Sequence, residues 1–562
     1  MGMPRWATRL LPGLVTLHGY ERSWLRGDTL AGLTVAAYLV PQVMAYAGLA
    51  GLPPVAGLWA ILAPLILYAI LGSSRLLSVG PESTTALMTA AAVAPLAGGD
   101  PARFAVLAGA LAVVVGLLCL VAFAARLGFV ADLLSKPILI GYLAGVAVTM
   151  IVGQLSKLTG VPVDGDGIPA ELASFVRNLD RMAPGTALFA AAVLALLFAG
   201  QWLFPRLPTP LLVVALATVA VVAFDLQRHG IDVVGAVPRG LPGPALPDLD
   251  DLRHLLLPAV GVLVVGYTDT VLTARAFAVR GGDPVDANQE LLAMGAANLG
   301  AGVTHGFPVS SSGSRTALAV AAGGRTQLYS LVALAAVVAV LVFAGPLLAH
   351  FPAAALGAIV VYAATRLVDV SGFRRLAAFR RTELLLALAA LGGVLVFDIL
   401  YGVLLAVGLS VAEMLHRVAR PHDAVQGFVP GLAGMHDVDD YPEATLVPGL
   451  LVYRYDSPLF FANAEDFRRR ALAAVDAQPE PVAWFVLNVE ANVEVDTTGL
   501  GALDDLRAEL TGRGIVFALA RVKQDLRAAL DAYGLSAAVG PERIYPTLPT
   551  AVEAYREWAR IR

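Results

Sequence analysis

Apolar segments of membrane-spanning length follow one another through residues 28–420, separated by short polar connections. A helix needs about 20 apolar residues to span a bilayer, and fewer where it is broken. Two sets of such segments are separated by the polar stretch Asp225–Arg253, and they begin near Leu30, Val55, Thr85, Phe104, Pro137, Thr186 and Pro210, then near Leu255, Leu291, Ser314, Leu328, Ala353, Glu383 and Leu400. An odd number of spans per set inverts the second set relative to the first. The pattern predicts an α-helical membrane protein with about 14 spans in a 7+7 inverted repeat.

The pattern changes after Arg420, where charged residues return and strand-like runs alternate with helical ones. The segments Leu450–Tyr455, Ala483–Val489 and Gly514–Ala520 are predicted to be strands. Residues 464–475, 497–511 and 522–532 have helical periodicity. Such alternation is typical of a small α/β domain with a mixed or parallel sheet, here over residues 449–562. Residues 421–448 are rich in Gly, Pro and Asp, so we expect them to form a linker.

Composition supports the membrane assignment and excludes several functions. Hydrophobic residues make up 58% of the chain and charged residues only 15%, whereas a soluble protein has about 25% charged residues. The net charge of -4 argues against a nucleic-acid partner. Cys119 is the only cysteine, which rules out a disulfide or a cysteine metal site within one chain. We find no phosphate-binding loop, metal-ligand cluster or nucleophile triad, so we expect no enzyme activity and no cofactor besides a coupling H⁺ or Na⁺.

Arginine placement predicts the orientation in the membrane. The first 27 residues lack the apolar core of a signal peptide and are expected to be a cytoplasmic N-terminal segment. With that end inside, the inner loops carry more basic residues than the outer ones, including the cluster Arg366, Arg374, Arg375, Arg380 and Arg381. An even number of spans also puts the α/β domain in the cytoplasm. The prediction is a multi-pass protein of the inner (plasma) membrane, with the lipid bilayer as a partner.

A polar interruption lies deep in apolar sequence at Thr304–Val320, THGFPVSSSGSRTALAV. Pro308 and Gly313 discourage a continuous helix. A helix that starts near Ser314 leaves its first N–H groups unpaired, which is a favourable position for an anion. Arg315 in the first turn adds a permanent positive charge. An extramembrane loop is the alternative, but we interpret the segment as an anion-binding break in a membrane helix, with Ser314 and Arg315 as the main ligands and Ser312 as a further one.

A second interruption, Ser78–Thr85, precedes a short apolar segment in the first half of the chain. Two broken segments at corresponding places in two halves indicate a transporter site at the repeat interface. Glu82 stands just before that short helix, where a carboxylate is favoured by the helix dipole. A carboxylate would repel an anion, so we expect Glu82 to orient the loop instead of binding substrate.

Asp269, with Thr273 one turn further on, is an ionisable group inside a predicted span. An aspartate near Arg315 could neutralise the arginine in the absence of the anion and take up a proton when the anion binds. Sodium symport is the rival, because Asp269 and Thr273 also offer hard oxygen ligands. No second carboxylate is evident nearby, which favours protons.

Long motifs in the same order resemble the SulP (solute-carrier-26) anion transporters with a C-terminal STAS domain. They are GDTLAGLTVAAYLVPQVMAYAGLAGLPP at 27–54, GLWAILAPLILYAILGSSRLLSVGPES at 57–83, the serine stretch at 304–316 and VEVDTTGL at 493–500. The segment FPVSSSGSRTA most resembles the corresponding segment of sulfate permeases of the actinobacterial type. The resemblance implies a transport domain over 28–420, with a core of spans 1–4 and 8–11 that moves as an elevator against a gate of spans 5–7 and 12–14.

The resemblance also implies roles for individual residues. Gln42 and Tyr46 match positions that line the substrate cavity, although a polar pair four residues apart could equally hold helices together. Thr497 matches a position that is phosphorylated in anti-sigma-factor antagonists, but a helix N-cap is the more ordinary role. The STAS domain would support dimerisation or regulation.

We therefore expect a secondary active transporter of sulfate or a similar small oxyanion, coupled to protons and assembled as a homodimer. A sodium- or proton-coupled carrier of bicarbonate or C4-dicarboxylates on the same scaffold is the first alternative. The second is a membrane regulator that senses an anion and signals through the STAS domain.

Overall fold

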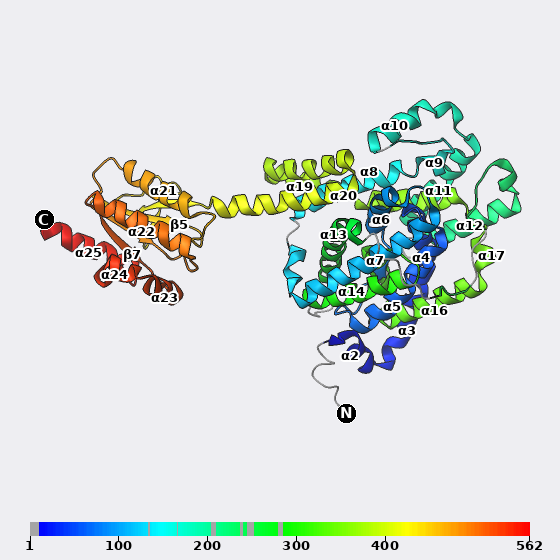
Figure 1. The fold of residues 1–562 in the computed structure, drawn as a ribbon, viewed down its shortest axis with the longest axis horizontal. Coiled ribbons are helices and arrows are strands. Elements are labelled where there is room, and N and C mark those ends of the chain that lie inside the picture. The colour runs from blue at the N-terminus through cyan, green and yellow to red at the C-terminus, as the bar shows by residue number, and fades with distance from the viewer. Residues whose placement is uncertain are drawn as a thin grey trace. The chain divides into compact units, whose positions relative to one another are not determined.

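The computed structural model describes residues 10–132, 135–165, 167–203, 209–235, 240–243, 252–278 and 285–561. Residues 1–9 of the expected N-terminal segment and parts of the polar stretch between the two span sets lie outside these ranges. The chain divides into two compact units, Met1–Ser410 and Val411–Arg562. Helices make up nearly all of the first unit, and a sheet with helices makes up most of the second (Figure 1).

The first unit confirms the predicted succession of spans. The helices that correspond to the predicted spans are α3 (Leu25–Leu49), α4 (Pro54–Ala60), α5 (Leu62–Leu71), α6 (Ser83–Ala97), α7 (Pro101–Ala124), α8 (Lys136–Val152), α11 (Pro184–Leu203), α12 (Thr209–Ala223), α13 (Leu252–Ala278), α14 (Ala287–Val303), α15 (Gly313–Ala321), α16 (Leu328–Phe343), α18 (Ala353–Leu367) and α20 (Arg381–Ala419), of which the last belongs to this unit as far as Ser410. Short helices α2 (Pro12–His18), α9 (Leu155–Thr159), α10 (Ile168–Arg177), α17 (Gly345–Leu348) and α19 (Val370–Phe379) connect or flank them. Helix α14 packs against α5 and α7, α16 packs against α3 and α5, and α18 packs against α8 and α11.

Helix α20 corresponds to the two last predicted spans. Its residues are helical from Arg381 to Ala419, yet a Cβ placed on Gly402 would lie 2.7 Å from the Cα of Val394. Residues eight apart in a straight helix are separated by about 12 Å along the axis. Gly393 likewise lies against the side chain of Leu405. The helix therefore doubles back into two packed arms, as two short spans require.

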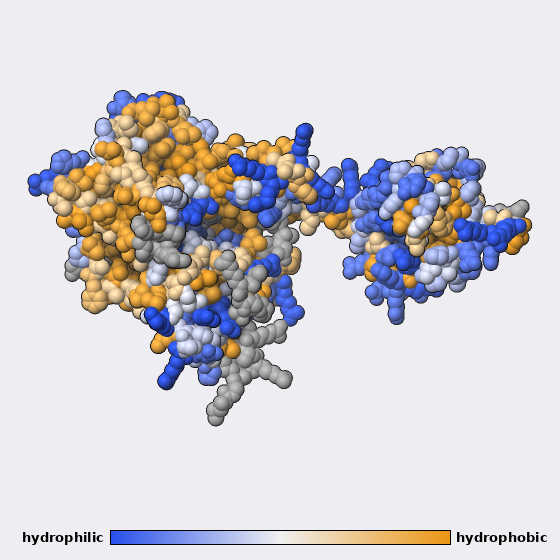
Figure 2. Space-filling view, turned by 180° about the vertical axis from the view of Figure 1, so that it is seen from behind, coloured by the Kyte–Doolittle hydropathy of each residue, from blue (hydrophilic) through white to orange (hydrophobic). Residues whose placement is uncertain are grey.

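The surface of the first unit is that of a membrane protein. Seven helices in the described part of the chain are long and apolar enough to cross a bilayer, and three shorter apolar helices are α6, α12 and α16. Large apolar side chains such as Trp202, Phe343 and Leu188 are exposed by 82%, 81% and 73%. Hydrophobic colour covers much of this unit in Figure 2. Exposed apolar area of this extent favours lipid contact over water.

The two predicted breaks meet in space. The strand β1 (Val79–Gly80) precedes α6, and the strand β2 (Ser310–Ser311) precedes α15. They pair antiparallel, with Val79 opposite Ser311 and Gly80 opposite Ser310. Because the irregular backbone pairs with itself inside protein, its polar groups are satisfied without water. The two short helices therefore start from one shared point.

Buried polar side chains hold the segment that leads into β1. The Glu290 carboxylate in α14 accepts hydrogen bonds from the backbone N–H of Ser73 at 3.0 Å and from its hydroxyl at 2.6 Å. The Gln327 amide donates to the carbonyl oxygens of Ser74 and Leu77 at 3.1 and 2.9 Å. An unpaired backbone polar group at this depth would cost several kcal/mol of stability. The side chains of Glu290 and Gln327 therefore contribute stability of about this size. They fix the height at which α6 begins.

We expect Gly57→Ala to destabilise the first unit. A Cβ on Gly57 in α4 would lie 1.9 Å from the carbonyl oxygen of Val43 in α3, so the helices must move apart. Overpacking of this kind costs about 1–3 kcal/mol. Thermal unfolding of the purified protein in detergent measures the loss. Gly408→Ala in α20 is the matched control, because no atom lies within 4 Å of its added Cβ; equal melting temperatures for the two variants would contradict the packing argument.

The second unit is a six-stranded sheet in the order β4-β3-β5-β6-β7-β8. Strands β5 (Leu450–Tyr455), β6 (Trp484–Asn488), β7 (Val516–Ala520) and β8 (Ile544–Tyr545) run parallel, and β3 (Asp423–Phe428) pairs antiparallel with β4 (Met435–Asp437) and β5. Its main helices are α21 (Ala464–Asp476), α22 (Thr497–Gly512), α23 (Gln524–Tyr533), α24 (Leu535–Val539) and α25 (Leu548–Ile561). The predicted mixed α/β domain is confirmed.

Two predictions for this unit are wrong. Residues 421–448 are not a plain linker, because β3 and β4 lie within them and belong to the sheet. The Gly and Pro content of this stretch concealed two short strands, of which β4 is at the edge of the sheet and β3 lies between β4 and β5. Thr497 is not the N-cap of α22 either: Asp496 holds that position, and its carboxylate accepts the Gly499 N–H at 2.7 Å. Thr497 is the exposed first residue of the helix.

Candidate functional site

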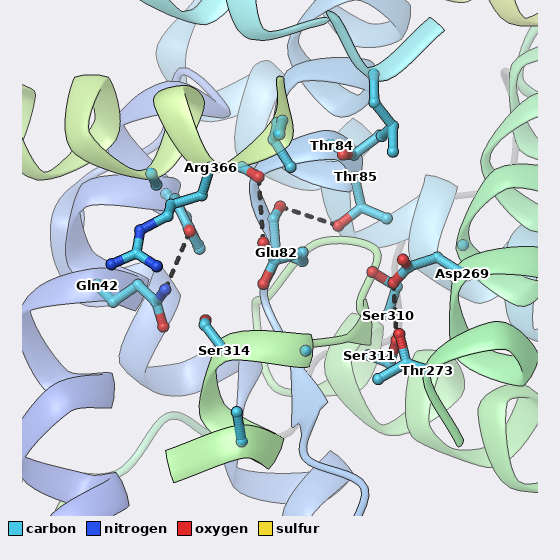
Figure 3. A pocket seen from close by; sticks show the side chains of 18 of the residues that line it. Gln42, Glu82, Thr84, Thr85, Asp269, Thr273, Ser310, Ser311, Ser314 and Arg366 are labelled. Carbon is cyan, nitrogen blue, oxygen red and sulfur yellow. Dashed lines mark hydrogen bonds between the residues drawn. The ribbon is translucent and has the colours of Figure 1, made fainter. Parts of the chain in front are cut away.

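A cavity of about 560 Å³ lies inside the first unit, between two groups of helices. One wall comes from α3, α13, α6 and α15, and the other from α8, α11 and α18. Its polar lining residues are Tyr38, Gln42, Tyr46, Glu82, Ser83, Thr84, Thr85, Gln201, Asp269, Thr273, Ser310, Ser311, Ser314, Tyr362 and Arg366. Figure 3 shows the side chains of Gln42, Glu82, Asp269 and Ser314, which it labels, directed toward the same space. The cavity therefore collects most of the residues that the sequence singled out.

Two helix N-termini border the cavity. Ser83 is the first residue of α6, and Gly313 and Ser314 are the first two of α15. The first N–H groups of a helix have no partner within it and carry partial positive charge. The β1–β2 pairing brings both ends to one place, so their fields add there. Such a position favours a small anion.

Gln42 and Tyr46 line the cavity and are bonded to each other. The Gln42 amide donates to the Tyr46 hydroxyl at 3.1 Å, and its carbonyl oxygen accepts from Arg315 at 3.1 Å. Both residues are almost fully buried. They are thus a packed polar pair as well as part of the cavity wall.

Arg315 does not line the cavity. It is completely buried behind the wall, where its guanidinium donates to Gln42, to the Ser78 hydroxyl at 3.2 Å and to the Pro81 carbonyl at 2.9 Å. The expected direct contact with an anion is therefore not what the geometry shows. A helical side chain leans toward the N-terminus of its helix, and that direction leads Arg315 into the β1 segment. Its Nη2 atom has no hydrogen-bond partner.

Glu82 borders the cavity itself, although we expected it only to orient the loop before α6. It is the N-cap residue of α6, lines the cavity, and has one carboxylate oxygen 3.7 Å from the Arg315 guanidinium. Its other oxygen accepts the Ser83 hydroxyl at 3.1 Å. Sequence reasoning found no second carboxylate near Asp269, and this was wrong because residues far apart in sequence share the cavity.

Asp269 and Thr273 lie on α13 and face the cavity together. The Asp269 carboxylate accepts the Ser311 hydroxyl at 2.7 Å. The ion pair of Arg315 is with Glu82, so the predicted pairing of Asp269 with Arg315 does not occur in this structure. Asp269 is a half-buried carboxylate whose hydrogen bond in the site comes from a serine, not from an arginine.

The serines of the break differ in position. Ser310, Ser311 and Ser314 line the cavity, while Ser312 is buried outside the lining and lies 3.2 Å from the Ser314 hydroxyl. Ser312 is the N-cap residue of α15, but its side chain makes no capping bond. Ser312 was expected to contact the substrate, but its hydroxyl contacts the hydroxyl of Ser314 instead.

Sequence reasoning missed four polar lining residues: Tyr38, Gln201, Tyr362 and Arg366. Arg366 was assigned to an inner loop, but it belongs to the last turn of α18. Tyr362 and Arg366 are four residues apart, which puts them on one helix face. This spacing could have indicated that both residues face the cavity. It was overlooked because Arg366 was counted among the arginines of an inner loop.

Comparison with known proteins matches both units. Residues 25–390 match the model of the sulfate permease family, and residues 441–551 match the STAS domain. A probable sulfate transporter of Mycobacterium tuberculosis is 61% identical over 547 residues, which cover 97% of this chain and 98% of that protein. Probable sulfate transporter 3.3 of Arabidopsis thaliana is 32% identical over 529 residues, or 90% of this chain and 84% of that protein.

Solved structures share the fold. The overall structure of SLC26A9 superposes with a TM-score of 0.91 at 22% identity, covering 98% of this chain and 93% of that one. The transmembrane domain of the cyanobacterial bicarbonate transporter BicA gives a TM-score of 0.61 at 22% identity, covering 70% of this chain and 98% of that one. These likenesses show the fold of the two units and nothing of the substrate.

Proposed function

Because the chain belongs to the sulfate permease family of anion transporters, we propose that it moves sulfate, or a similar small oxyanion, across the membrane by secondary active transport. One observation carries this proposal: the N-termini of α6 and α15 converge on a cavity of about 560 Å³. The named relatives are described as sulfate transporters, which favours sulfate over other oxyanions.

An oxyanion in this cavity would meet donors from several elements. These donors are the N–H groups of Ser83 and Ser314 and the hydroxyls of Ser310 and Tyr38. They would replace the water molecules that hydrate the anion in solution. Helix N-termini stabilise anions by about 0.3–1 kcal/mol each when exposed, and more when partly buried. Arg315 acts from behind the wall, where its charge is balanced by Glu82. It holds the two breaks in place and does not bind the anion directly.

Charge balance supports coupling to protons. Glu82 and Arg315 offset each other, which leaves Asp269 as the uncompensated carboxylate of this wall. A dianion and an ionised Asp269 would repel each other in a medium of low dielectric constant. Protonation of Asp269 on substrate binding would remove this repulsion. The same residue with Thr273 could instead bind Na⁺ through oxygen ligands, so the test below includes a sodium gradient.

The two walls supply the moving parts. We assign spans 1–4 and 8–11 to a core that carries Ser314 and Asp269, and the remaining spans to a gate that carries Tyr362. Sliding of the core against the gate would expose the cavity to each side in turn, as in an elevator. The arginine-rich loops favour a cytoplasmic N-terminus and STAS domain in a plasma-membrane protein, and we propose a homodimer.

Uptake of labelled sulfate into proteoliposomes of the purified chain tests this function. We expect uptake to rise when the outside is made more acidic than the inside, because inward proton flow then drives the anion against its gradient. An inward sodium gradient at equal pH is expected to have no effect. Stimulation by sodium alone would replace the proton by Na⁺ as the coupling ion.

Absence of sulfate flux from folded protein under every gradient would contradict the sulfate assignment. Bicarbonate and C4-dicarboxylates would then be tried as substrates. Saturable sulfate binding without any flux would instead support a sensor, and substitution of Thr497 would then change a downstream signal.

A further inference from the structure

The charges that border the cavity pose a problem for an anion site. Glu82 and Asp269 both face the cavity, whereas Arg315 lies behind the wall and is paired with Glu82. That wall therefore offers an anion helix N-termini and hydroxyl groups, but no free positive charge. Attraction of a divalent anion requires positive charge from another source.

The opposite wall provides a cation. Among the described residues that line the cavity, Arg366 is the one basic side chain. In the view of Figure 3, Arg366 and Asp269 lie on opposite sides of the cavity, with Glu82 between them. The two carboxylates thus belong to one group of helices and the arginine to the other.

The arginine is held in a defined orientation. Its Nη2 atom donates to the hydroxyl of Tyr362 at 2.6 Å, and its guanidinium carbon lies 5.3 Å from the centre of the Tyr362 ring. Tyr362 is buried, so it is a rigid support. A guanidinium has five N–H donors, and one of them is used by Tyr362. The others remain for an anion, and the exposed side chain gives them access to water and solutes.

We propose that Arg366 is the anion-binding cation of the α18 wall and that it makes the site prefer divalent to monovalent oxyanions. This inference rests on the proposed function, because it concerns the same cavity. The attraction between a fixed charge and an anion scales with the charge of the anion. A tetrahedral dianion also has enough oxygen atoms to accept from Ser314 on one wall and Arg366 on the other. A planar monoanion gains about half of that attraction.

Equilibrium binding and initial uptake of labelled sulfate by Arg366→Gln in the full-length protein test the proposal. We expect the Kd and the KM for sulfate to rise about tenfold, as for the loss of one charge-assisted contact that is partly exposed to water. Competition by nitrate, a monovalent planar oxyanion, is expected to weaken only about threefold, because its charge is half as large. The preference for sulfate over nitrate therefore falls.

Three further variants separate binding from structure. Arg366→Lys keeps the charge and is expected to retain most of the preference for sulfate. Tyr362→Phe removes the hydroxyl that orients the guanidinium and is expected to raise the KM two- to threefold, by the loss of one hydrogen bond. Arg374→Gln removes an exposed arginine of α19 that does not line the cavity, and its binding constants are expected to equal those of the wild type.

The outcomes are distinct. Unchanged sulfate binding by Arg366→Gln, or equal loss of sulfate and nitrate binding, overturns this inference alone. A loss of equal size in Arg374→Gln overturns it as well, because the effect is then one of general surface charge. Wild-type protein that neither binds nor transports sulfate overturns the proposed function together with the inference.

Discussion

Arg315→Ala is expected to lower sulfate uptake by more than about 100-fold. The guanidinium donates to Gln42, Ser78 and the Pro81 carbonyl, and pairs with Glu82. Hydrogen bonds to a charged group contribute about 1.5–3 kcal/mol each, so loss of all of them exceeds the energy of a 100-fold effect. Ser78, Pro81 and Glu82 belong to the break before α6, so the arginine ties the first turn of α15 to that break in addition to the β1–β2 pairing. Its loss is expected to loosen the convergence of the two N-termini. Initial uptake rates into proteoliposomes measure the effect.

The same substitution also leaves Glu82 as an uncompensated carboxylate. Breaking a buried ion pair on one side costs about 3–5 kcal/mol of stability, and a poorly folded variant would also be inactive. The double variant Arg315→Ala/Glu82→Gln removes both charges, so we expect it to recover most of the melting temperature but not the uptake. Recovery of uptake together with stability would show that Arg315 matters only through its charge balance with Glu82.

Asp269→Asn is expected to abolish proton-driven accumulation of sulfate while leaving downhill flux. Asparagine keeps the size and an acceptor for the Ser311 hydroxyl, but it cannot take up a proton. With the membrane potential clamped at zero, one coupled proton sustains about a tenfold sulfate ratio per pH unit, since one unit corresponds to about 1.36 kcal/mol. The wild type should approach that ratio, and the variant should stop at equal concentrations.

Ser311→Ala is the matched control for this experiment. It removes the hydroxyl that contacts Asp269 and leaves the carboxylate in place. We expect proton-driven accumulation to persist in it, with altered pH dependence. Continued accumulation by Asp269→Asn would exclude Asp269 as the coupling group and direct attention to Glu82, the second carboxylate of the cavity.

The sequence was sufficient to predict the membrane-spanning elements of the first unit. Apolar length predicted the succession of spans, with the largest offset at the first helix, expected near Leu30 and observed from Leu25. Loss of hydrogen-bonding options in hydrocarbon makes every long apolar run a helix, which is why this reasoning works. Pro308 and Gly313 marked the break before α15, and the helix begins at Gly313. Short-range backbone chemistry decides such features.

Two strands of the second unit were less accessible to this reasoning. Strands β3 and β4 lie in a stretch with the composition of a linker, and their conformation depends on pairing, of β3 with β5 and of β4 with β3. Strand formation depends on a neighbour that may be far along the chain. Local composition therefore misjudged residues 421–448.

What the tertiary structure alone decided is the assignment of charges within the site. From the sequence, Arg315 was an anion ligand, Glu82 a loop residue and Arg366 part of an inner loop. In the fold, Arg315 is buried against Ser78 and Gln42, and Arg366 faces the cavity instead. Residue type and spacing state which groups a chain carries and which face of a helix they share. The direction of a long charged side chain, and the partner that neutralises it, depend on segments more than 200 residues away in this chain, such as the 237 residues between Arg315 and Ser78, and only their packing determines them.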